Sequence, residues 1–260
     1  MSPELDGRSW RTTPGVDASR TTCHEAKSID GSLLPRSKRK FCTISVQKSN
    51  TIRGVTVKPS QQMIGDDVHW LKPDQVDRMR DGVRDGRHPE RDEAIITLLY
   101  DTGLRRAELS KVNREMLDLE NELLLIPSRI QKGLPTEQEP KPATFKLDRG
   151  ENLRTVETLE TYFEIRNGAE ALFPSQMSPR MSPKGVNDVV KRAARDAEIR
   201  PYAFEKRGEP TDISAHTLRH SVAWRMLRVE DGNTLYDVRN RLRHRSILTT
   251  ERSYDHFETI

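Results

Sequence analysis

Apolar side chains recur at helical spacing through most of the chain beyond residue 68. The clearest stripe predicts a helix over residues 91–100 and consists of Ala94, Ile95, Leu98 and Leu99. Gly103 follows this stripe, and glycine readily adopts the left-handed conformation that ends a helix. The same pattern predicts further helices over residues 73–81, 104–112, 150–166, 183–197, 214–229, 233–242 and 246–257.

The periodicity changes between residues 116 and 147, where we expect strands. Residues 116–119 and 123–126 flank a turn, and residues 143–147 form a third stretch of the same kind. The segment before this third stretch contains Lys132 and three prolines, as a loop does. These features predict a small three-stranded antiparallel sheet with Lys132 at its tip. The fold class is therefore α+β and mainly helical.

The N-terminal segment has a different composition. Residues 1–62 are polar, and we expect a mostly disordered arm before a domain at residues 63–260, with residues 41–46 able to form a short strand. Residues 1–60 hold 11 Lys/Arg and 5 Asp/Glu, whereas the other 200 residues hold 33 and 35. The arm either binds nucleic acid through counterion release or serves only as a solubilising tail.

Composition also disfavours several classes of protein. No apolar run approaches the ~18–20 residues of a membrane span, and no secretory signal follows the N-terminus. Both cysteines lie in the basic arm. We therefore expect a cytoplasmic, nucleoid-associated protein. The sequence has no phosphate-binding loop and no metal-ligand spacing, so it predicts no cofactor and no metal.

Candidate chemistry begins at Arg105, at the start of the helix expected over residues 104–112. A helix N-terminus favours anions, and a guanidinium matches phosphate oxygens. Glu108 lies three residues later and can orient this guanidinium. Arg106 points about 100° away around the helix, toward solvent or a DNA backbone.

A second group of candidates lies in the helix expected over residues 214–229. His216 and Arg219 are three residues apart and share one helix face, so they can contact one phosphate. The alternative is an ordinary helix surface. His220 lies about 100° from Arg219, and we interpret it as a packing or capping residue.

A third group lies close to the C-terminus. His244 stands among four arginines that either contact DNA or form a solvated face, namely Arg239, Arg241, Arg243 and Arg245. Tyr254 follows His244 by ten residues. Such a tyrosine is, by itself, more often a packing residue than a nucleophile.

Taken together, these residues resemble the catalytic domain of the tyrosine recombinase (phage integrase) family over about residues 67–258. The strings that carry the resemblance are TGLR-x-x-EL, H-T-L-R-H, and H-x-S-I-x-T-T followed by Tyr-x-His. The resemblance implies a homotetramer that acts on double-stranded DNA at paired recombination sites. Accessory DNA-bending proteins are possible further partners.

The resemblance also implies a role for each residue. Tyr254 would attack the scissile phosphate and form a 3′-phosphotyrosyl bond. Arg105 and Arg219 would hold the non-bridging oxygens, and His216 and His244 would support the transition state. The general acid to the leaving 5′ oxygen would be Lys132. Arg106, Arg243 and Arg245 would contact DNA.

Three departures from the family pattern stand out. The tyrosine usually follows the second histidine by nine residues, and we expect the intervening loop to absorb the extra residue before Tyr254. Arg243 stands where the family often has glycine, so this turn is either helical or mildly strained. The polar arm is not expected to form the family's N-terminal clamp domain, and only six residues follow Tyr254.

The leading hypothesis is a DNA-cutting and rejoining enzyme: an integrase, resolvase or inversion recombinase of a mobile element. A second is a non-catalytic, recombinase-like DNA-binding regulator, although binding alone requires neither Tyr254 nor Lys132. A third is a relaxing topoisomerase that uses the same chemistry.

Overall fold

The computed structural model describes residues 68–131, 140–166, 168–204 and 206–257. Its α-helices are α1 (Pro73–Gly82), α2 (Pro89–Thr102), α3 (Arg106–Leu109), α4 (Thr155–Ile165), α5 (Pro183–Asp196), α6 (Ala215–Arg228), α7 (Leu235–Leu242) and α8 (Ile247–Tyr254). Its strands are β1 (Leu117–Asp118), β2 (Leu123–Ile126) and β3 (Ala143–Lys146). Short 3₁₀ helices cover Arg114–Met116, Ser128–Ile130, Pro210–Asp212 and Asp255–Phe257.

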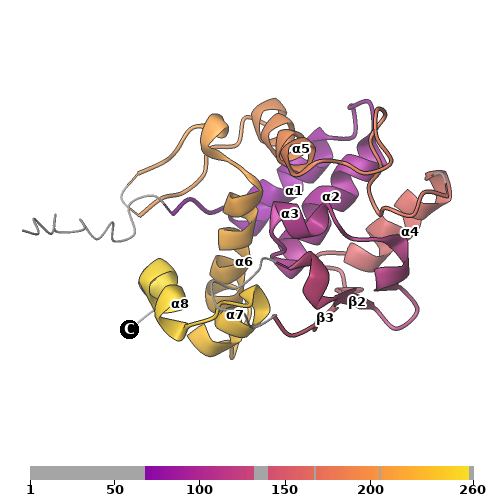
Figure 1. The fold of residues 1–260 in the computed structure, drawn as a ribbon. Coiled ribbons are helices and arrows are strands. Elements are labelled where there is room, and N and C mark those ends of the chain that lie inside the picture. The colour runs from indigo at the N-terminus through magenta and orange to yellow at the C-terminus, as the bar shows by residue number, and fades with distance from the viewer. Residues whose placement is uncertain (1–67, 132–139, 167, 205, 258–260) are drawn as a thin grey trace, which may run out of the picture. The chain divides into compact units, whose positions relative to one another are not determined.

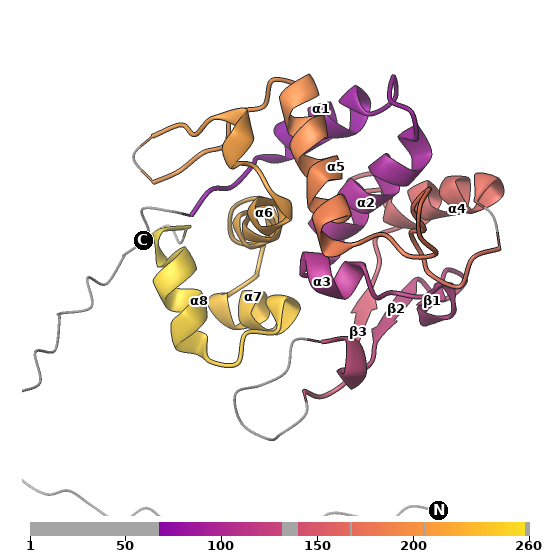
Figure 2. The ribbon, with the colours of Figure 1, turned by 45° about the horizontal axis from the view of Figure 1, so that its top comes forward.

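The helix α2 forms the centre of the core. Ten of its 14 residues are buried, and it packs against α4, α5 and α6. The helix α6 is buried along much of its length and lies between α2 on one side and α7 on the other (Figure 1). The helices α7 and α8 pack against each other beside α6, as the second view also shows (Figure 2). The C-terminal end of α7 also approaches the end of α2, where Arg241 pairs with Asp101.

Side-chain caps fix where the helices of the site begin. The hydroxyl of Ser214 accepts hydrogen bonds from the backbone N–H groups of His216 and Thr217, at 3.2 and 3.4 Å. Thr234 caps α7 in the same way, and Ser246 caps α8. Such caps satisfy backbone donors that the first helical turn leaves free.

The sheet confirms the expected topology, with strand order β1-β2-β3 and both pairs antiparallel. Leu117 pairs with Leu124, and Leu124 pairs with Phe145. These three side chains are buried and join the main core. The strand expected over residues 116–119 is shorter than predicted, because Met116 belongs to a 3₁₀ turn.

Two predicted helices are also too long. The helix expected over residues 104–112 is only α3, because the chain beyond it pairs with a later segment: Leu172 N–H donates to Val112 C=O, and Arg114 N–H donates to Glu170 C=O. The helix expected over residues 150–166 begins at Thr155. The carboxylate of Asp148 accepts the backbone N–H groups that precede it, and these residues form turns instead.

The other predicted helices are confirmed to within about two residues, although the last one ends in a 3₁₀ turn. Within the described residues, no helix is long and apolar enough to cross a membrane. The arm at residues 1–62, the strand proposed at 41–46 and the hairpin residue Lys132 lie outside the described residues.

Candidate functional site

Arg105 occupies the N-cap of α3 and is held by Glu108. The backbone N–H of Arg105 donates to Oε2 of Glu108 at 3.0 Å, and its guanidinium Nη1 donates to Oε1 at 3.1 Å. The Arg105 side chain is 32% exposed, whereas that of Glu108 is 1% exposed. Glu108 therefore orients Arg105 from its buried side, as the sequence predicted, and leaves the arginine accessible to an anion.

Glu108 also binds a second arginine. Nη2 of Arg243 lies 2.5 Å from Oε2 of Glu108, and the Arg243 side chain is 13% exposed. Burial by itself raises the pKa of the Glu108 carboxyl, but Arg243 and Arg105 outweigh it and lower that pKa. Arg243 is thus directed into the protein rather than onto an open DNA-facing surface.

Arg219 is buried on α6 and joins two segments of the chain. Its Nη1 donates to the carbonyl of Gly103, and its Nη2 donates to the carbonyl of Leu242. Gly103 caps α2 in the left-handed conformation, with φ of 66°. A Cβ at this position would lie 2.5 Å from a methyl group of Leu242, so a larger residue would be strained here and would displace Leu242.

Burial lowers the pKa of Arg219 to about 9, assisted by Arg105, and the guanidinium remains protonated at neutral pH. Each terminal nitrogen of an arginine carries two hydrogens, so Arg219 retains N–H groups beyond the two carbonyls it binds. Arg219 is therefore a fixed cation with N–H donors that remain available to a ligand.

Arg105, His216 and Arg219 line one open cleft of about 630 Å³. The cleft is also lined by Arg106, Ala107, Asn187, Lys191, Ser214 and Ala215. Its charged side chains are all basic, and a phosphate group fits such a surface. The three candidates from two separate motifs are therefore brought together. Because these residues are the candidates for binding phosphate, we call Arg105, Glu108, His216 and Arg219 the phosphate-binding half of the candidate site.

His216 is exposed at this cleft, but its walls still shield the imidazole from bulk water. The pKa of His216 is lowered by this desolvation first, and then by Arg219 and Arg105. Its ring packs edge-on against His220, with 4.3 Å between the ring centroids. His220 lies one helical turn further along α6, deeper in the protein.

His220 holds the phenol of Tyr254. Its Nδ1 lies 2.7 Å from the Tyr254 hydroxyl, and Tyr254 is 1% exposed. Burial, followed by the charges of His216 and Arg219, lowers the pKa of His220 well below its usual value. Burial also raises the pKa of the Tyr254 phenol, which Arg219 and Arg105 oppose. Both partners are therefore neutral, and Nδ1 can accept the phenolic proton.

His244 completes this second group. Its Nδ1 lies 3.0 Å from the Thr250 hydroxyl, and its ring stacks on that of Tyr254 at 6.1 Å between centroids and 14° between planes. Burial, assisted by Arg219, lowers the pKa of His244 to about 3. The ten-residue spacing does not remove Tyr254 from the site. We call His220, His244 and Tyr254 the nucleophile half.

The turn before His244 was expected to be either helical or mildly strained, and it is not helical. Arg243 has φ of 54° and ψ of 48°, which is left-handed rather than helical. The N–H of Arg243 donates to Asn240 C=O, and the N–H of His244 donates to Arg239 C=O. These two bonds define a Schellman motif, in which glycine is the usual residue at the position of Arg243. The strained alternative is the one that the structure adopts.

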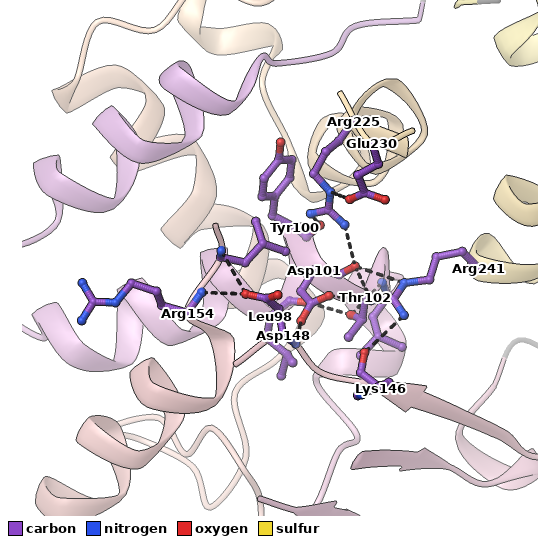
Figure 3. Close-up of polar contacts among 12 residues, drawn as sticks. Leu98, Tyr100, Asp101, Thr102, Lys146, Asp148, Arg154, Arg225, Glu230 and Arg241 are labelled. Atoms are coloured by element: carbon purple, nitrogen blue, oxygen red, sulfur yellow. Dashed lines mark hydrogen bonds and ion pairs between the residues drawn. The ribbon is translucent and has the colours of Figure 1, made fainter. Parts of the chain in front are cut away.

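Arg241, in the last turn of α7, is also anchored. Figure 3 shows Arg241 reaching Asp101, with 2.5 Å between Arg241 Nη2 and Asp101 Oδ1. The other carboxylate oxygen of Asp101 accepts the backbone N–H of Asp148, and Arg225 donates to its carbonyl. Arg241 also donates to the carbonyl of Lys146 on β3. The end of α7 is therefore tied to the end of α2 and to the sheet.

The predicted DNA-contacting arginines have different environments. Arg106 and Arg245 are exposed, as expected. Arg243 and Arg241 are engaged with buried carboxylates, so the arginine run is not a single solvated face. The sequence analysis interpreted His220 as a packing or capping residue and did not single out Lys191. The spacing of His216 and His220, one helical turn apart, could have identified His220 as a neighbour of the site.

In the part of the chain that the structure describes, no group of three or more His, Cys, Asp or Glu side chains could hold a metal ion. The polar groups of the site are basic or neutral, apart from the buried carboxylate of Glu108. The arrangement is suited to binding a phosphate, and the Tyr254 phenol is buried behind the cleft, against His220.

Comparison with known proteins identifies the family. Residues 69–259 match the model of the phage integrase family, and the chain belongs to it. It is 33% identical over 190 residues to the tyrosine recombinase XerC of Bifidobacterium longum (strain DJO10A), which covers 71% of this chain and 48% of the relative. The chain spans about half the length of the curated relatives it matches.

Solved structures confirm the fold. The crystal structure of XerA recombinase is similar with a TM-score of 0.54 and 20% identity, over 70% of this chain and 58% of that chain. The Tn1549 transposon integrase in complex with transposon right end DNA gives a TM-score of 0.56 and 18% identity, over 73% and 61%. The mainly helical fold with one small antiparallel sheet is therefore that of a tyrosine recombinase catalytic domain.

Proposed function

We propose that this protein is a site-specific DNA recombinase that cuts and rejoins double-stranded DNA through a 3′-phosphotyrosyl intermediate. One observation carries the proposal: Arg105, His216 and Arg219, from separate motifs, line one basic cleft. Behind His216 lies His220, which is hydrogen-bonded to the buried Tyr254. Binding of DNA alone would not require a buried tyrosine bonded to a neutral imidazole.

In the proposed reaction, Arg105 and Arg219 bind the non-bridging oxygens of the scissile phosphate. Attack by the Tyr254 oxygen adds negative charge around phosphorus, so fixed cations stabilise the transition state more than the ground state. A bond forms between the Tyr254 oxygen and phosphorus while the bond from phosphorus to the 5′ oxygen breaks. The backbone linkage is stored in the covalent bond, and rejoining reverses the step.

Two proton transfers accompany this exchange. His220 Nδ1 accepts the phenolic proton, because the imidazole is neutral and already within hydrogen-bond distance. The leaving 5′ oxygen takes a proton from Lys132, which the family resemblance assigns as general acid. His216 and His244 hydrogen-bond the transition state. The phenol is covered in this structure, so reaction also requires α8 to bring Tyr254 to the cleft.

Double-stranded DNA is the proposed partner, and Arg106 and Arg245 are proposed to contact its backbone. A fold neighbour in complex with transposon end DNA supports this assignment. We further propose that four protomers act on paired recombination sites, with possible help from accessory DNA-bending proteins. The basic arm at residues 1–62 would add affinity through counterion release.

A nicked suicide substrate tests the proposal. The substrate is duplex DNA from the flanks of the gene, nicked so that the cleaved end diffuses away and the covalent complex accumulates. We expect wild-type protein to form a denaturation-resistant protein–DNA adduct without ATP. Tyr254→Phe should form none, yet bind the same DNA with unchanged affinity. A folded wild-type protein that binds this DNA and forms no adduct would instead indicate a non-catalytic DNA-binding regulator.

A further inference from the structure

Arg243 adopts a backbone conformation that does not suit its residue type. With φ of 54°, it lies in the left-handed region where a Cβ is disfavoured and where glycine commonly ends a helix. Arg154 has the same φ of 54°, but its side chain is exposed and pairs with an exposed carboxylate. The side chain of Arg243, in contrast, is largely buried. The two arginines form a natural comparison.

The buried side chain of Arg243 has one specific partner. Its Nη2 donates to Oε2 of Glu108 at 2.5 Å. Its Nε and Nη1 are buried and make no hydrogen bond to the described residues, and its guanidinium lies 5.2 Å from the centroid of the Phe145 ring. The position of this guanidinium is therefore set by Glu108, with Phe145 beneath it.

Glu108 connects two parts of the site. Its Oε1 and Oε2 bind the guanidinium and the backbone N–H of Arg105, and Oε2 also binds Arg243. Arg243 immediately precedes His244 and the segment that ends at Tyr254. One buried carboxylate thus links a phosphate-binding arginine to the start of the nucleophile segment.

We infer that Arg243 is a positioning residue, which acts through Glu108 to fix Arg105 relative to the turn that leads to His244 and Tyr254. This inference rests on the proposed function. The ion pair keeps Glu108 ionised, because the two arginines lower a pKa that burial alone would raise. An ionised Glu108 in turn holds Arg105 in the orientation that the phosphate requires.

The test compares Arg243→Gly with Arg154→Gly on the nicked suicide substrate. Both substitutions replace a left-handed arginine by the residue that this conformation favours, so both variants should fold. The rate of adduct formation should fall about 10- to 100-fold in Arg243→Gly, since small misplacements of a reacting group have effects of this size. It should be unchanged in Arg154→Gly, and DNA affinity should stay within about twofold in both.

Three further readouts separate positioning from a merely structural role. Without Arg243, burial should raise the pKa of Glu108, so adduct formation should be lost on the acidic side at a higher pH than in wild type. Arg105 is the other charged group that faces Glu108, and it remains in place. Arg243→Lys should restore part of the rate, because a cation again faces the carboxylate. In a Glu108→Gln background, Arg243→Gly should have little additional effect.

Each outcome decides the inference. An adduct rate and pH profile of Arg243→Gly within twofold of wild type would overturn it and leave the proposed function standing. Effects of Arg243→Gly and Glu108→Gln that multiply independently would also overturn it. A wild-type protein that forms no adduct would overturn the proposed function itself. If Arg243→Gly does not fold, Arg243→Asn takes its place in each comparison, because asparagine also tolerates the left-handed conformation.

Discussion

The two halves of the site differ in how their side chains are held. In the phosphate-binding half, Arg219 is tied to two backbone carbonyls and Arg105 to a buried carboxylate, yet both line an open cleft. In the nucleophile half, Tyr254 is buried and hydrogen-bonded to a neutral histidine. The first half is charged and open to the cleft, whereas the second is uncharged and covered.

This difference has a physical basis. Cations repel one another, so a cluster of them persists only where fixed acceptors hold each one, as Glu108 and the carbonyls of Gly103 and Leu242 do here. The phenol needs no counter-charge until it loses its proton. Burial suits the neutral phenol, and the cations become useful to it only as the reaction proceeds.

The largest predicted effect comes from breaking the phosphate-binding half at Arg219. Arg219→Ala should lower the rate of adduct formation by at least about 10²–10³-fold, the usual effect of removing one fixed donor from a transition state. Arg219→Lys should recover little of it, because one ammonium cannot bridge the carbonyls of Gly103 and Leu242. Single-turnover kinetics on the nicked substrate provide the measurement.

The control for this prediction is an exposed arginine. Arg245→Ala should weaken DNA binding slightly, lower the salt dependence by about one counterion, and leave the cleavage rate of bound DNA unchanged. Equal losses of cleavage in Arg219→Ala and Arg245→Ala would contradict the distinction between a fixed and an exposed cation.

The nucleophile half should be sensitive at His220. His220→Phe retains the ring but removes the acceptor of the phenolic proton, so adduct formation should fall by about 10²-fold at unchanged DNA affinity. His256→Phe is the matched control, because His256 packs against Phe257 beside Tyr254 without a hydrogen bond to the phenol. A His220→Phe variant as fast as wild type would rule out His220 as the proton acceptor.

The stability of the protein should be sensitive to a single methyl group at Gly103, where the end of α2 packs against Leu242 of α7. Gly103→Ala should lower the free energy of unfolding by about 2–4 kcal/mol, through left-handed strain and a collision with Leu242. Gly232→Ala provides the control, since Gly232 has φ of +80° and nothing within 4 Å of its added Cβ. Gly232→Ala should lower the free energy of unfolding by about 1 kcal/mol. Chemical denaturation measures both, and equal losses would show that the contact with Leu242 is unimportant.

The smallest predicted effect is a pH dependence of stability. Folded His244 has a pKa of about 3, whereas the unfolded residue binds a proton below about pH 6.5. The unfolded state therefore binds more protons between these values, and stability falls as pH falls from about 6.5 toward 3. Between pH 7 and pH 5, His244 alone should account for about 1–2 kcal/mol. His244→Gln should reduce the loss by this amount, and an unchanged loss would contradict it.

Much of the fold was predictable because it depends on local patterns. The apolar stripe in α2 and the glycine that follows this helix are local signals, and α2 lies within two residues of its predicted bounds. The predicted C-terminal end of α3 was wrong because Val112 pairs with the distant Leu172. The predicted start of α4 was wrong because the carboxylate of Asp148 binds the backbone that precedes this helix.

The same division applies to the site. Arg105, His216 and Arg219 could be named from their motifs, and Glu108 from its spacing to Arg105. The inward direction of Arg243 depends on a carboxylate 135 residues away, and spacing along the chain contains no such information. His220 was undervalued for a similar reason, because its partner Tyr254 lies on a different helix.

The central claim is that Tyr254 attacks a phosphate held by the other half of the site. The most direct measurement locates the DNA in the covalent adduct by trypsin digestion, nuclease trimming and fragmentation mass spectrometry. Trypsin cuts after Arg252, so the account predicts a nucleotide joined through its 3′ phosphate to Tyr254, on the tryptic peptide that begins at Ser253. The same modification should be absent in Tyr254→Phe. Attachment to Ser253, to Tyr236 or to any other residue would contradict it.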